Sequence, residues 1–154
     1  MSRAEGTFTG DSAVVNEVMH KHAPGFVALG FELTGADLAG FPKLQRFPVF
    51  HFLNRQTGMQ IDVSYYVNIT GLNRGFTVLI IEPLNNKLDV EDYLELHGHE
   101  ELTKSFSYHG PITDPRSFAD CFLQNLVGLL DSDLKPILEG RVWEETPIDW
   151  MGYK

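Results

Sequence analysis

The clearest pattern along the chain is an alternation of apolar and polar residues between positions 59 and 69. Side chains two residues apart share one face of an extended strand, so this alternation predicts a β-strand. Segments 47–54 and 76–85 are also rich in β-branched and aromatic residues, and glycine-bearing turns separate the three segments. The spacing favours hairpins over crossovers and predicts an antiparallel meander of about three to five strands.

The two faces of the predicted middle strand differ in polarity. The apolar face carries Ile61, Val63, Tyr65, Val67 and Ile69, and the polar face carries Gln60, Asp62, Ser64, Tyr66 and Asn68. We therefore expect one face of the sheet to be covered and the other to be at least partly in contact with water.

Both faces of the predicted third strand are apolar. Leu79 and Ile81 lie on the side opposite to Phe76, Val78 and Ile80. This pattern predicts either burial on both sides or a patch that is reserved for a partner. Leu79 and Ile81, with Tyr66 on the neighbouring strand, are therefore candidate binding residues.

A helical period precedes the meander. Asp11 or Ser12 can cap a helix whose apolar positions recur every three or four residues, and Pro24-Gly25 is expected to end it. Residues 1–10 show no period and are predicted to be a flexible tail. Residues 26–46 contain several glycines and predict a short extended piece followed by an irregular loop.

Two further helices follow the meander. Asp89 is expected to cap a short helix that ends near Gly98, and residues 103–110 can add an edge strand. Asp114 and Pro115 then form a strong helix start. The whole pattern predicts a single α+β domain over residues 1–154, with the meander packed on an N-terminal helix and a long C-terminal helix.

The C-terminal helix has an apolar stripe that includes Cys121, so this thiol is predicted to lie in the core. The helix is expected to break near Pro136 and to stop at Gly140. The tail after it is rich in aromatic residues, which are costly to leave in water, and we expect it to pack back on the body. Trp150, within this tail, is a further candidate binding residue.

The composition excludes several classes of function. With 21 acidic residues against 12 Lys and Arg, the net charge of −9 disfavours binding to nucleic acid, which requires a cationic surface. The same charge suits a basic protein partner, and a homo-oligomer is the other expectation. Apolar runs are too short for a membrane span or a signal peptide, and one cysteine cannot form an internal disulfide. A cytoplasmic location is predicted.

Half of the histidines lie in "LHGHEELTKSFSYHG", residues 96–110. His97 and His99 would share a face on an extended segment, and with His109 and Glu100 they could bind zinc or another transition metal. Their spacing fits neither the cupin motif nor HEXXH. The simpler interpretation is a helix that ends at His97 and Gly98, where histidine interacts well with the helix dipole.

Other chemistry has less support in the sequence. His51, Asp62 and Ser64 could meet across adjacent strands, but there is no nucleophile elbow, and an ordinary polar sheet face explains the same residues. No phosphate-binding glycine motif or CxxC pair is present. No catalytic residue and no cofactor other than the possible metal is therefore predicted. A cavity for an apolar ligand, lined by Phe50, Phe52, Tyr65 and Phe122, is a further hypothesis.

The layout of "GFEL", "FPVFHFLNRQTGMQIDVSYYVNI" and "GFTVLIIEPL" resembles small bacterial α+β proteins of the DUF4304-like group, whose function is unknown. Some acidic proteins of this general type are toxin-immunity proteins, and the order of elements also resembles type III secretion chaperones. This resemblance covers roughly residues 25–85 and transfers no functional residue. The net charge, the two-sided apolar third strand, the aromatic tail and the lack of a catalytic signature predict a non-enzymatic protein that binds another protein, such as a bacterial toxin or a secreted effector. The alternative is a metal-binding protein or metal-dependent enzyme that uses the histidine cluster.

Overall fold

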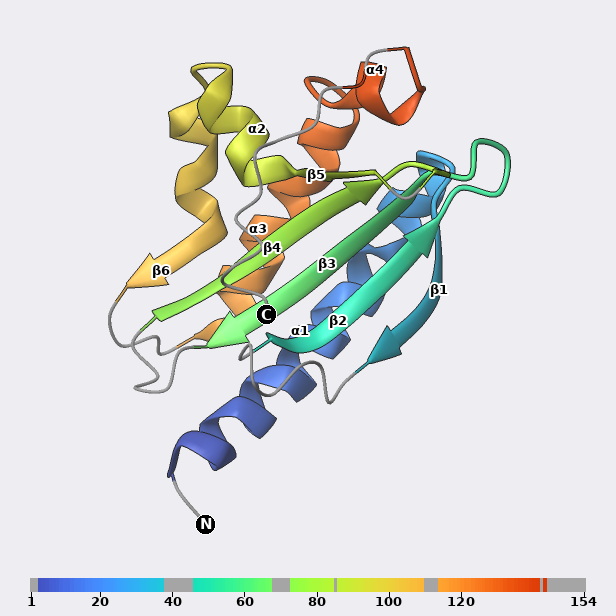
Figure 1. The fold of residues 1–154 in the computed structure, drawn as a ribbon. Coiled ribbons are helices and arrows are strands. Elements are labelled where there is room, and N and C mark those ends of the chain that lie inside the picture. Colours follow the sequence, from blue (N-terminus) through green and yellow to red (C-terminus); the bar gives the residue numbers. More distant parts are fainter. Residues whose placement is uncertain are drawn as a thin grey trace.

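A computed structural model describes residues 3–37, 46–67, 73–84, 86–109, 114–141 and 143 (Figure 1). Within these ranges only the backbone is described for residues 3–12, 37, 46–47, 67, 73–74, 105 and 107–109. The elements in chain order are α1 (Arg3–Ala28), β1 (Glu32–Asp37), β2 (Arg46–Leu53), β3 (Gln60–Val67), β4 (Asn73–Ile81), β5 (Lys87–Asp89), α2 (Val90–Leu96), η2 (Glu100–Phe106), β6 (Ser107–His109), α3 (Pro115–Leu130) and α4 (Lys135–Leu138).

Strands β1 to β5 form an antiparallel meander in which each strand pairs with the next along the chain. β6 pairs with β4 as well. β3 pairs with the whole length of one edge of β4, so β5 and β6 share its other edge: β5 pairs with the end at 79–81 and β6 with the end at 73–75. The segment that holds α2 and η2 runs from one end of this edge to the other.

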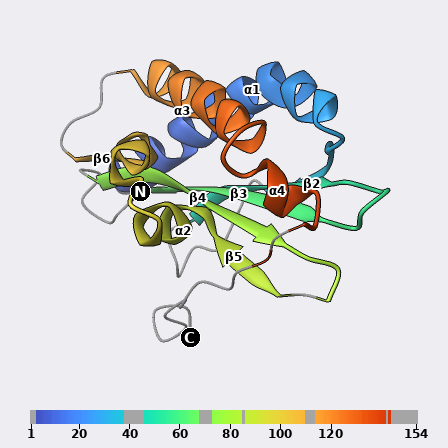
Figure 2. The same cartoon turned by 90° about the horizontal axis from the view of Figure 1, so that it is seen from above.

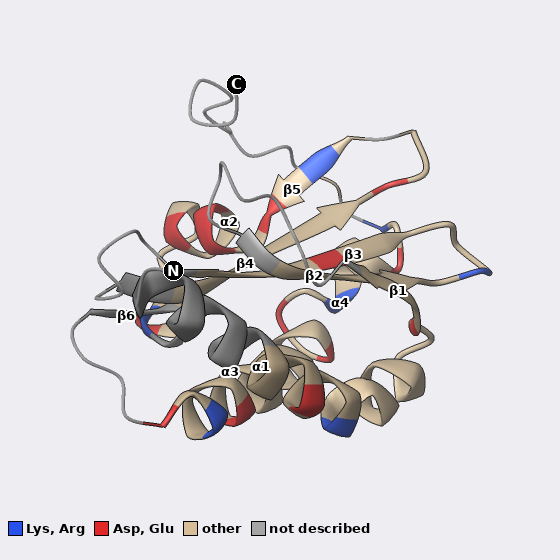
Figure 3. Cartoon of the chain, turned by 90° about the horizontal axis from the view of Figure 1, so that it is seen from below, with Lys and Arg blue, Asp and Glu red and all other residues tan. Residues whose placement is uncertain are grey.

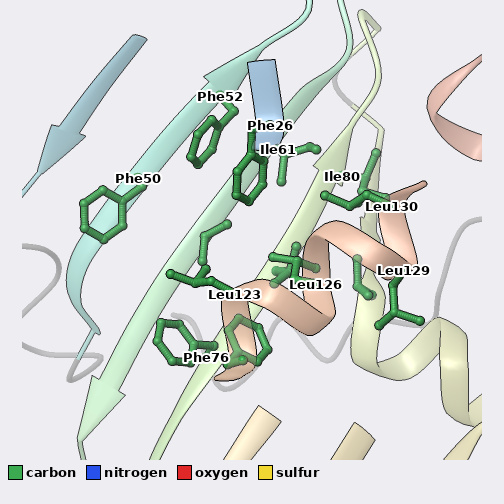
Figure 4. Packing of buried hydrophobic residues seen from close by; sticks show 14 of the residues in the cluster. Phe26, Phe50, Phe52, Ile61, Phe76, Ile80, Leu123, Leu126, Leu129 and Leu130 are labelled. Atoms are coloured by element: carbon green, nitrogen blue, oxygen red, sulfur yellow. The ribbon is translucent and has the colours of Figure 1, made fainter. Parts of the chain in front are cut away.

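Helices α1 and α3 lie side by side on one face of the sheet (Figure 2). The side chains between them and the sheet form the core (Figure 4). The ring of Phe26 in α1 stacks on that of Phe52 in β2 with centroids 4.1 Å apart, and the ring of Phe76 in β4 stacks on that of Phe122 in α3 at 4.2 Å. Each helix is thus fixed to the sheet by an aromatic pair.

The predicted α+β class, the antiparallel meander and its packing on an N-terminal and a C-terminal helix are confirmed. The polarity of the middle strand is confirmed too: Ile61, Val63 and Tyr65 are buried in the core. The hypothesis of an apolar ligand cavity has no support, because Phe50, Phe52, Tyr65 and Phe122 are fully buried members of the packed cluster.

The predicted boundaries of the first helix are wrong at both ends. α1 begins at Arg3, inside the stretch that the sequence predicts as a tail, and it continues through Pro24 to Ala28. Gly25 does not end the helix but faces α3, where a side chain would begin in ordinary contact with Val127 at 3.4 Å. Burial of Phe26 in the next position holds the last turn on the sheet.

Two other expectations also differ from the structure. Residues 32–37, predicted to be partly irregular, form β1 as an additional strand of the meander. Cys121 is exposed on α3, because the buried face of this helix passes through Phe122, Leu123 and Leu126 instead. The long helix also ends earlier than predicted, and a turn at 131–134 separates α3 from α4. None of the described helices is both long enough and apolar enough to cross a bilayer.

Candidate functional site

The sheet face that points away from α1 and α3 carries the predicted binding residues. Antiparallel register places residues of this face in rows across the strands. One row runs from Gly35 through His51, Asp62 and Leu79 to Asp89. We call this surface the outer face. It mixes polar and apolar side chains, as the sequence predicts for the polar side of the meander.

Three polar side chains of the outer face form a hydrogen-bonded cluster. The Nδ1 atom of His51 lies 2.8 Å from Oδ1 of Asp62, and Nε2 of Gln60 donates to the same oxygen at 2.9 Å. The His51 side chain is 37% exposed and that of Asp62 18% exposed. A carboxylate in this position orients the imidazole ring and favours the tautomer with hydrogen on Nδ1.

Ser64 does not complete a catalytic triad with this pair. It lies opposite Val49 and Thr77 in the neighbouring row, whereas His51 lies opposite Asp62. Two residues along a strand correspond to about 6–7 Å, which is beyond hydrogen-bond reach for a serine hydroxyl. The Ser/His/Asp hypothesis is therefore right about the His51–Asp62 contact and wrong about the nucleophile. Ser64 is therefore not placed opposite His51 as the nucleophile of a triad.

Two predicted binding residues, Leu79 and Ile81, are half-buried on the outer face. Tyr66 is also half-buried, and its phenol lies over Gly75, since a side chain on that glycine would begin only 2.5 Å from the Tyr66 hydroxyl. Tyr66 thus fills the space that Gly75 leaves. Trp150 lies outside the described residues.

An acidic edge adjoins Leu79 and Ile81. Asp89 caps α2 by accepting a hydrogen bond from the backbone N–H of Asp92 at 3.1 Å. Residues 89–101 contain six carboxylates and no Lys or Arg, and Figure 3 shows α2 coloured red at its acidic positions. Burial is the main cause that raises the pKa of Glu91 to about 7, and the charges of Asp89, Glu95 and Asp92 contribute to the same rise in that order. Burial also raises the pKa of Asp92.

This acidic edge was missed as a site in the sequence. The run of carboxylates from 89 to 101 is the signal in the sequence, but the same stretch contains His97 and His99, and the pattern of these residues is also that of metal ligands. α2 follows directly on β5, so its acidic residues lie beside β4, the strand that carries Leu79 and Ile81. That arrangement follows from the pairing of Leu79 with Asp89, which only the three-dimensional register reveals.

The histidine cluster forms the end of a helix, as the simpler interpretation predicts. His97 is the C-cap residue of α2, and Gly98 follows with a positive φ of 76°. The N–H of Gly98 bonds to the carbonyl of Glu95 and that of His99 to the carbonyl of Leu94, which is the Schellman arrangement. The His97 ring lies against that of Tyr93, with centroids 4.3 Å apart.

The metal hypothesis gains no support from these positions. Within the described part of the chain no group of three or more His, Cys, Asp or Glu side chains could hold a metal ion, so His97, His99 and Glu100 do not form one by themselves. The backbone of His109 pairs with Asn73 at the far end of η2, and its side chain lies outside the described residues. The four-residue site with His109 stays a prediction.

A second ionic contact joins the two long helices. Oδ1 of Asp120 in α3 accepts a hydrogen bond from Nζ of Lys21 at 2.8 Å and lies 2.7 Å from Nε2 of His22. The hydrogen bond from Lys21 and the contact with His22 lower the pKa of Asp120. The sequence could not indicate this contact, because its partners lie almost one hundred residues apart and the rotation of each helix is set by the core.

A shallow depression of about 290 Å³ lies where α1, β1 and the β2–β3 turn meet. Its walls include Val27, Phe31 and Leu53, and its polar residues include Glu32 and Arg55. Nε of Arg55 donates a hydrogen bond to the Glu32 carboxylate. Small-molecule sites usually enclose about 300–1,000 Å³. This depression is therefore better suited to one side chain than to a whole metabolite.

Comparisons with protein-family models, with curated proteins and with solved structures find no match to this chain. The resemblance to DUF4304-like and immunity-type proteins stays a prediction. The function must therefore be inferred from the chain's own geometry.

Proposed function

We propose that this chain is a non-enzymatic protein-binding module that holds a basic partner on its outer face and acidic edge. The observation that carries the proposal is the position of half-buried Leu79, which lies beside Asp62 on β3 and close to α2, where Glu91 and Asp92 are half-buried and Glu95 is exposed. Asp89, in the same row as Leu79, is buried as the N-cap of this helix. An apolar centre bordered by carboxylates is complementary to a partner with an apolar centre and a basic rim. The role would be immunity-like or chaperone-like, in the cytoplasm of a bacterium.

The charge of the chain supports a basic partner over a second copy of itself. A net charge of −9 speeds encounter with a cationic protein and opposes self-association. The raised pKa of Glu91 also fits, because a cation bound nearby would relieve the repulsion among Glu91, Asp89 and Glu95. A homo-oligomer through the same face would bring two acidic edges together, and the repulsion between their charges would oppose its formation.

The proposal is tested by partner recovery with matched variants. The tagged chain is purified from its native host beside Leu79→Glu, in which a charge enters the apolar centre of the outer face. Leu84→Glu makes the same chemical change at a side chain that is 82% exposed in the β4–β5 turn. We expect Leu79→Glu to reduce recovery of the partner by about tenfold or more and Leu84→Glu to leave it unchanged.

Thermal denaturation of both variants shows whether they fold, and Ile81→Glu repeats the test at the next row. If Leu79→Glu and Ile81→Glu recover as much partner as the parent chain does, the outer face is not the binding surface. A strictly monomeric parent chain that recovers no protein above background would overturn the proposal as a whole.

The alternative prediction, a zinc or other transition-metal site at His97, His99, His109 and Glu100, has its own test. Elemental analysis of protein prepared without chelator would show about one metal ion per chain, lost in the His97→Ala, His99→Ala double variant. Metal-free protein would exclude this alternative.

A further inference from the structure

β1 forms one of the two edges of the sheet. This strand stands at one end of the strand order and pairs only with β2 within the described chain (Figure 1). An unpaired edge presents a row of backbone N–H and C=O groups that a second extended chain can join. Proteins usually protect such edges with lysine, proline or β-bulges; β1, with the sequence ELTGAD, contains no lysine or proline and has a single bulge.

The backbone of β1 is easy to reach. Glu32, Thr34, Gly35 and Ala36 are all exposed, and nothing lies within 4 Å of the point where a side chain on Gly35 would begin. A bulge at Thr34 interrupts the pairing with β2, and the Thr34 hydroxyl donates to the carbonyl of His51 at 3.2 Å. The bulge bends the strand after Leu33, but regular pairing resumes from Gly35 to Asp37.

The charges of β1 decide which kind of segment fits. Glu32 begins the strand and Asp37 ends it. If two copies of the chain paired antiparallel through this edge, Glu32 of each copy would lie near Asp37 of the other. Like charges that face each other across strands destabilise the pairing. A strand that carries Lys or Arg at these places is stabilised instead.

The depression beside Glu32 offers a place for one basic side chain. Val27, which is 57% exposed, Phe31 and Leu53 form apolar walls that suit the methylene stem of Lys or Arg, and Glu32 suits its charged end. Arg55 now occupies this position in an ion pair with Glu32, with side chains 71% and 48% exposed. Ion pairs this exposed add little stability, so an incoming cation can replace Arg55.

We propose that the β1 edge binds an extended segment of a partner protein that bears Lys or Arg, and that one of these side chains replaces Arg55 on Glu32. The segment adds a strand to the sheet, and its backbone hydrogen bonds give affinity while the Glu32 depression gives selectivity. The inference rests on the proposed function in one respect, since the segment belongs to the basic protein partner.

The test uses the full chain and a short synthetic peptide that alternates lysine with valine. We expect amide NMR signals of Glu32–Asp37 to shift on titration and these amides to gain protection from hydrogen exchange. The same peptide with glutamate in place of lysine, and one N-methylated along a single edge, are expected not to bind. Shifts confined to α2, or no measurable binding, would overturn the inference.

Two variants make the test specific for Glu32. Glu32→Gln removes the receiving carboxylate and is expected to weaken peptide binding by about threefold or more, whereas Arg55→Ala removes the competing cation and is expected to strengthen it by a similar factor. Arg116→Ala makes the same change of net charge at the exposed pair with Glu17 on the helical side and should have no effect. Equal affinities for Glu32→Gln, Arg55→Ala and the parent would contradict the proposal.

The edge inference and the proposed function can fail separately. Loss of the native partner in Leu79→Glu, with recovery in Glu32→Gln equal to that of the parent chain, would leave the outer face as the binding surface and reject the edge. Peptide binding at β1 by a chain that recovers no partner would do the reverse.

Discussion

Glu91 shows how the surroundings of one carboxyl group set its charge. It lies in the first turn of α2, where burial disfavours the charged form and the neighbouring acids add repulsion. Its pKa of about 7 means that the group is partly protonated at neutral pH. A helix N-terminus normally favours an acid, so the repulsion and burial outweigh the helix dipole here. The charge of the acidic edge therefore depends on pH.

Glu91→Gln tests this account through stability. The folded pKa lies above the ordinary value of 4.5, so the protonated form contributes stability that is fully present below about pH 4.5 and is lost as pH rises through about 7. An unscreened shift of this size would correspond to about 3 kcal/mol, and partial exposure reduces it to about 1 kcal/mol. We expect the variant to match the parent at pH 5 and to be more stable by that amount at pH 8.

Chemical denaturation at the two pH values measures the free energy of unfolding. Glu101→Gln is the control, because Glu101 is exposed and pairs with Lys104 at 2.9 Å. It should give no gain at pH 8. A parent chain whose stability does not fall between pH 5 and 8 relative to Glu91→Gln would show that Glu91 is ionised in the folded state like an ordinary glutamate.

At the scale of elements, three helices end in the same way. Gly30, Gly98 and Gly140 adopt positive φ after α1, α2 and α4, and each belongs to a pair of backbone hydrogen bonds that closes the helix. Gly98 and Gly140 were predicted because each follows the last residue of an apolar period. Gly30 was missed because Pro24-Gly25 comes first and is a stronger local signal, which the packing of α1 on α3 overrides.

Gly30→Ala and Gly128→Ala should change stability in opposite directions. Gly30 has φ of 93°, and a side chain there would begin 2.9 Å from the Asn54 amide nitrogen. We expect Gly30→Ala to lower the free energy of unfolding by about 1–2 kcal/mol. Gly128 lies within α3 with nothing within 4 Å, so Gly128→Ala should raise it by about 0.5–1 kcal/mol. Urea denaturation measures both, and changes of the same sign would contradict the helix-end assignment.

The candidate site could be predicted only in part from the sequence, and the reason also belongs to this scale. Alternation assigned His51 and Asp62 to polar faces of neighbouring strands, and their contact was therefore foreseeable. Whether Ser64 or Asp62 lies opposite His51 depends on register, which the turn at 54–59 fixes and periodicity does not. The pairing of Leu79 with Asp89 depends in the same way on the turn between β4 and β5.

At the scale of the whole molecule, Phe122 connects three parts of the fold. Its ring stacks on Phe76 of the sheet at 4.2 Å and meets the ring of Phe106 in η2 edge-on at 5.0 Å. α3, the meander and the segment that leads to β6 therefore share one buried contact. The class of the fold was predictable because the apolar pattern alone requires a sheet covered by helices. The place of α2 and η2 was not, since a short helix carries too little pattern to show which edge it follows.

Phe122→Ala should destabilise the whole molecule rather than one element. A fully buried phenylalanine replaced by alanine costs about 3–5 kcal/mol, and Phe122→Leu should cost less because it retains most of the volume. Hydrogen exchange should show that β4, η2 and α3 lose protection together. A loss of about 1 kcal/mol or less in Phe122→Ala, or a loss of protection confined to α3, would contradict this role.

The double use of one edge of β4 has a consequence for how the chain can be divided. β5 and β6 anchor the two ends of the α2–η2 excursion to the same strand, and Gly98 lies at the turn between them with nothing within 4 Å. A cut or an inserted reporter at this glycine leaves both anchors in place. Two separately expressed fragments, 1–97 and 98–154, should therefore reassemble, which would make this turn the natural split point for a complementation sensor.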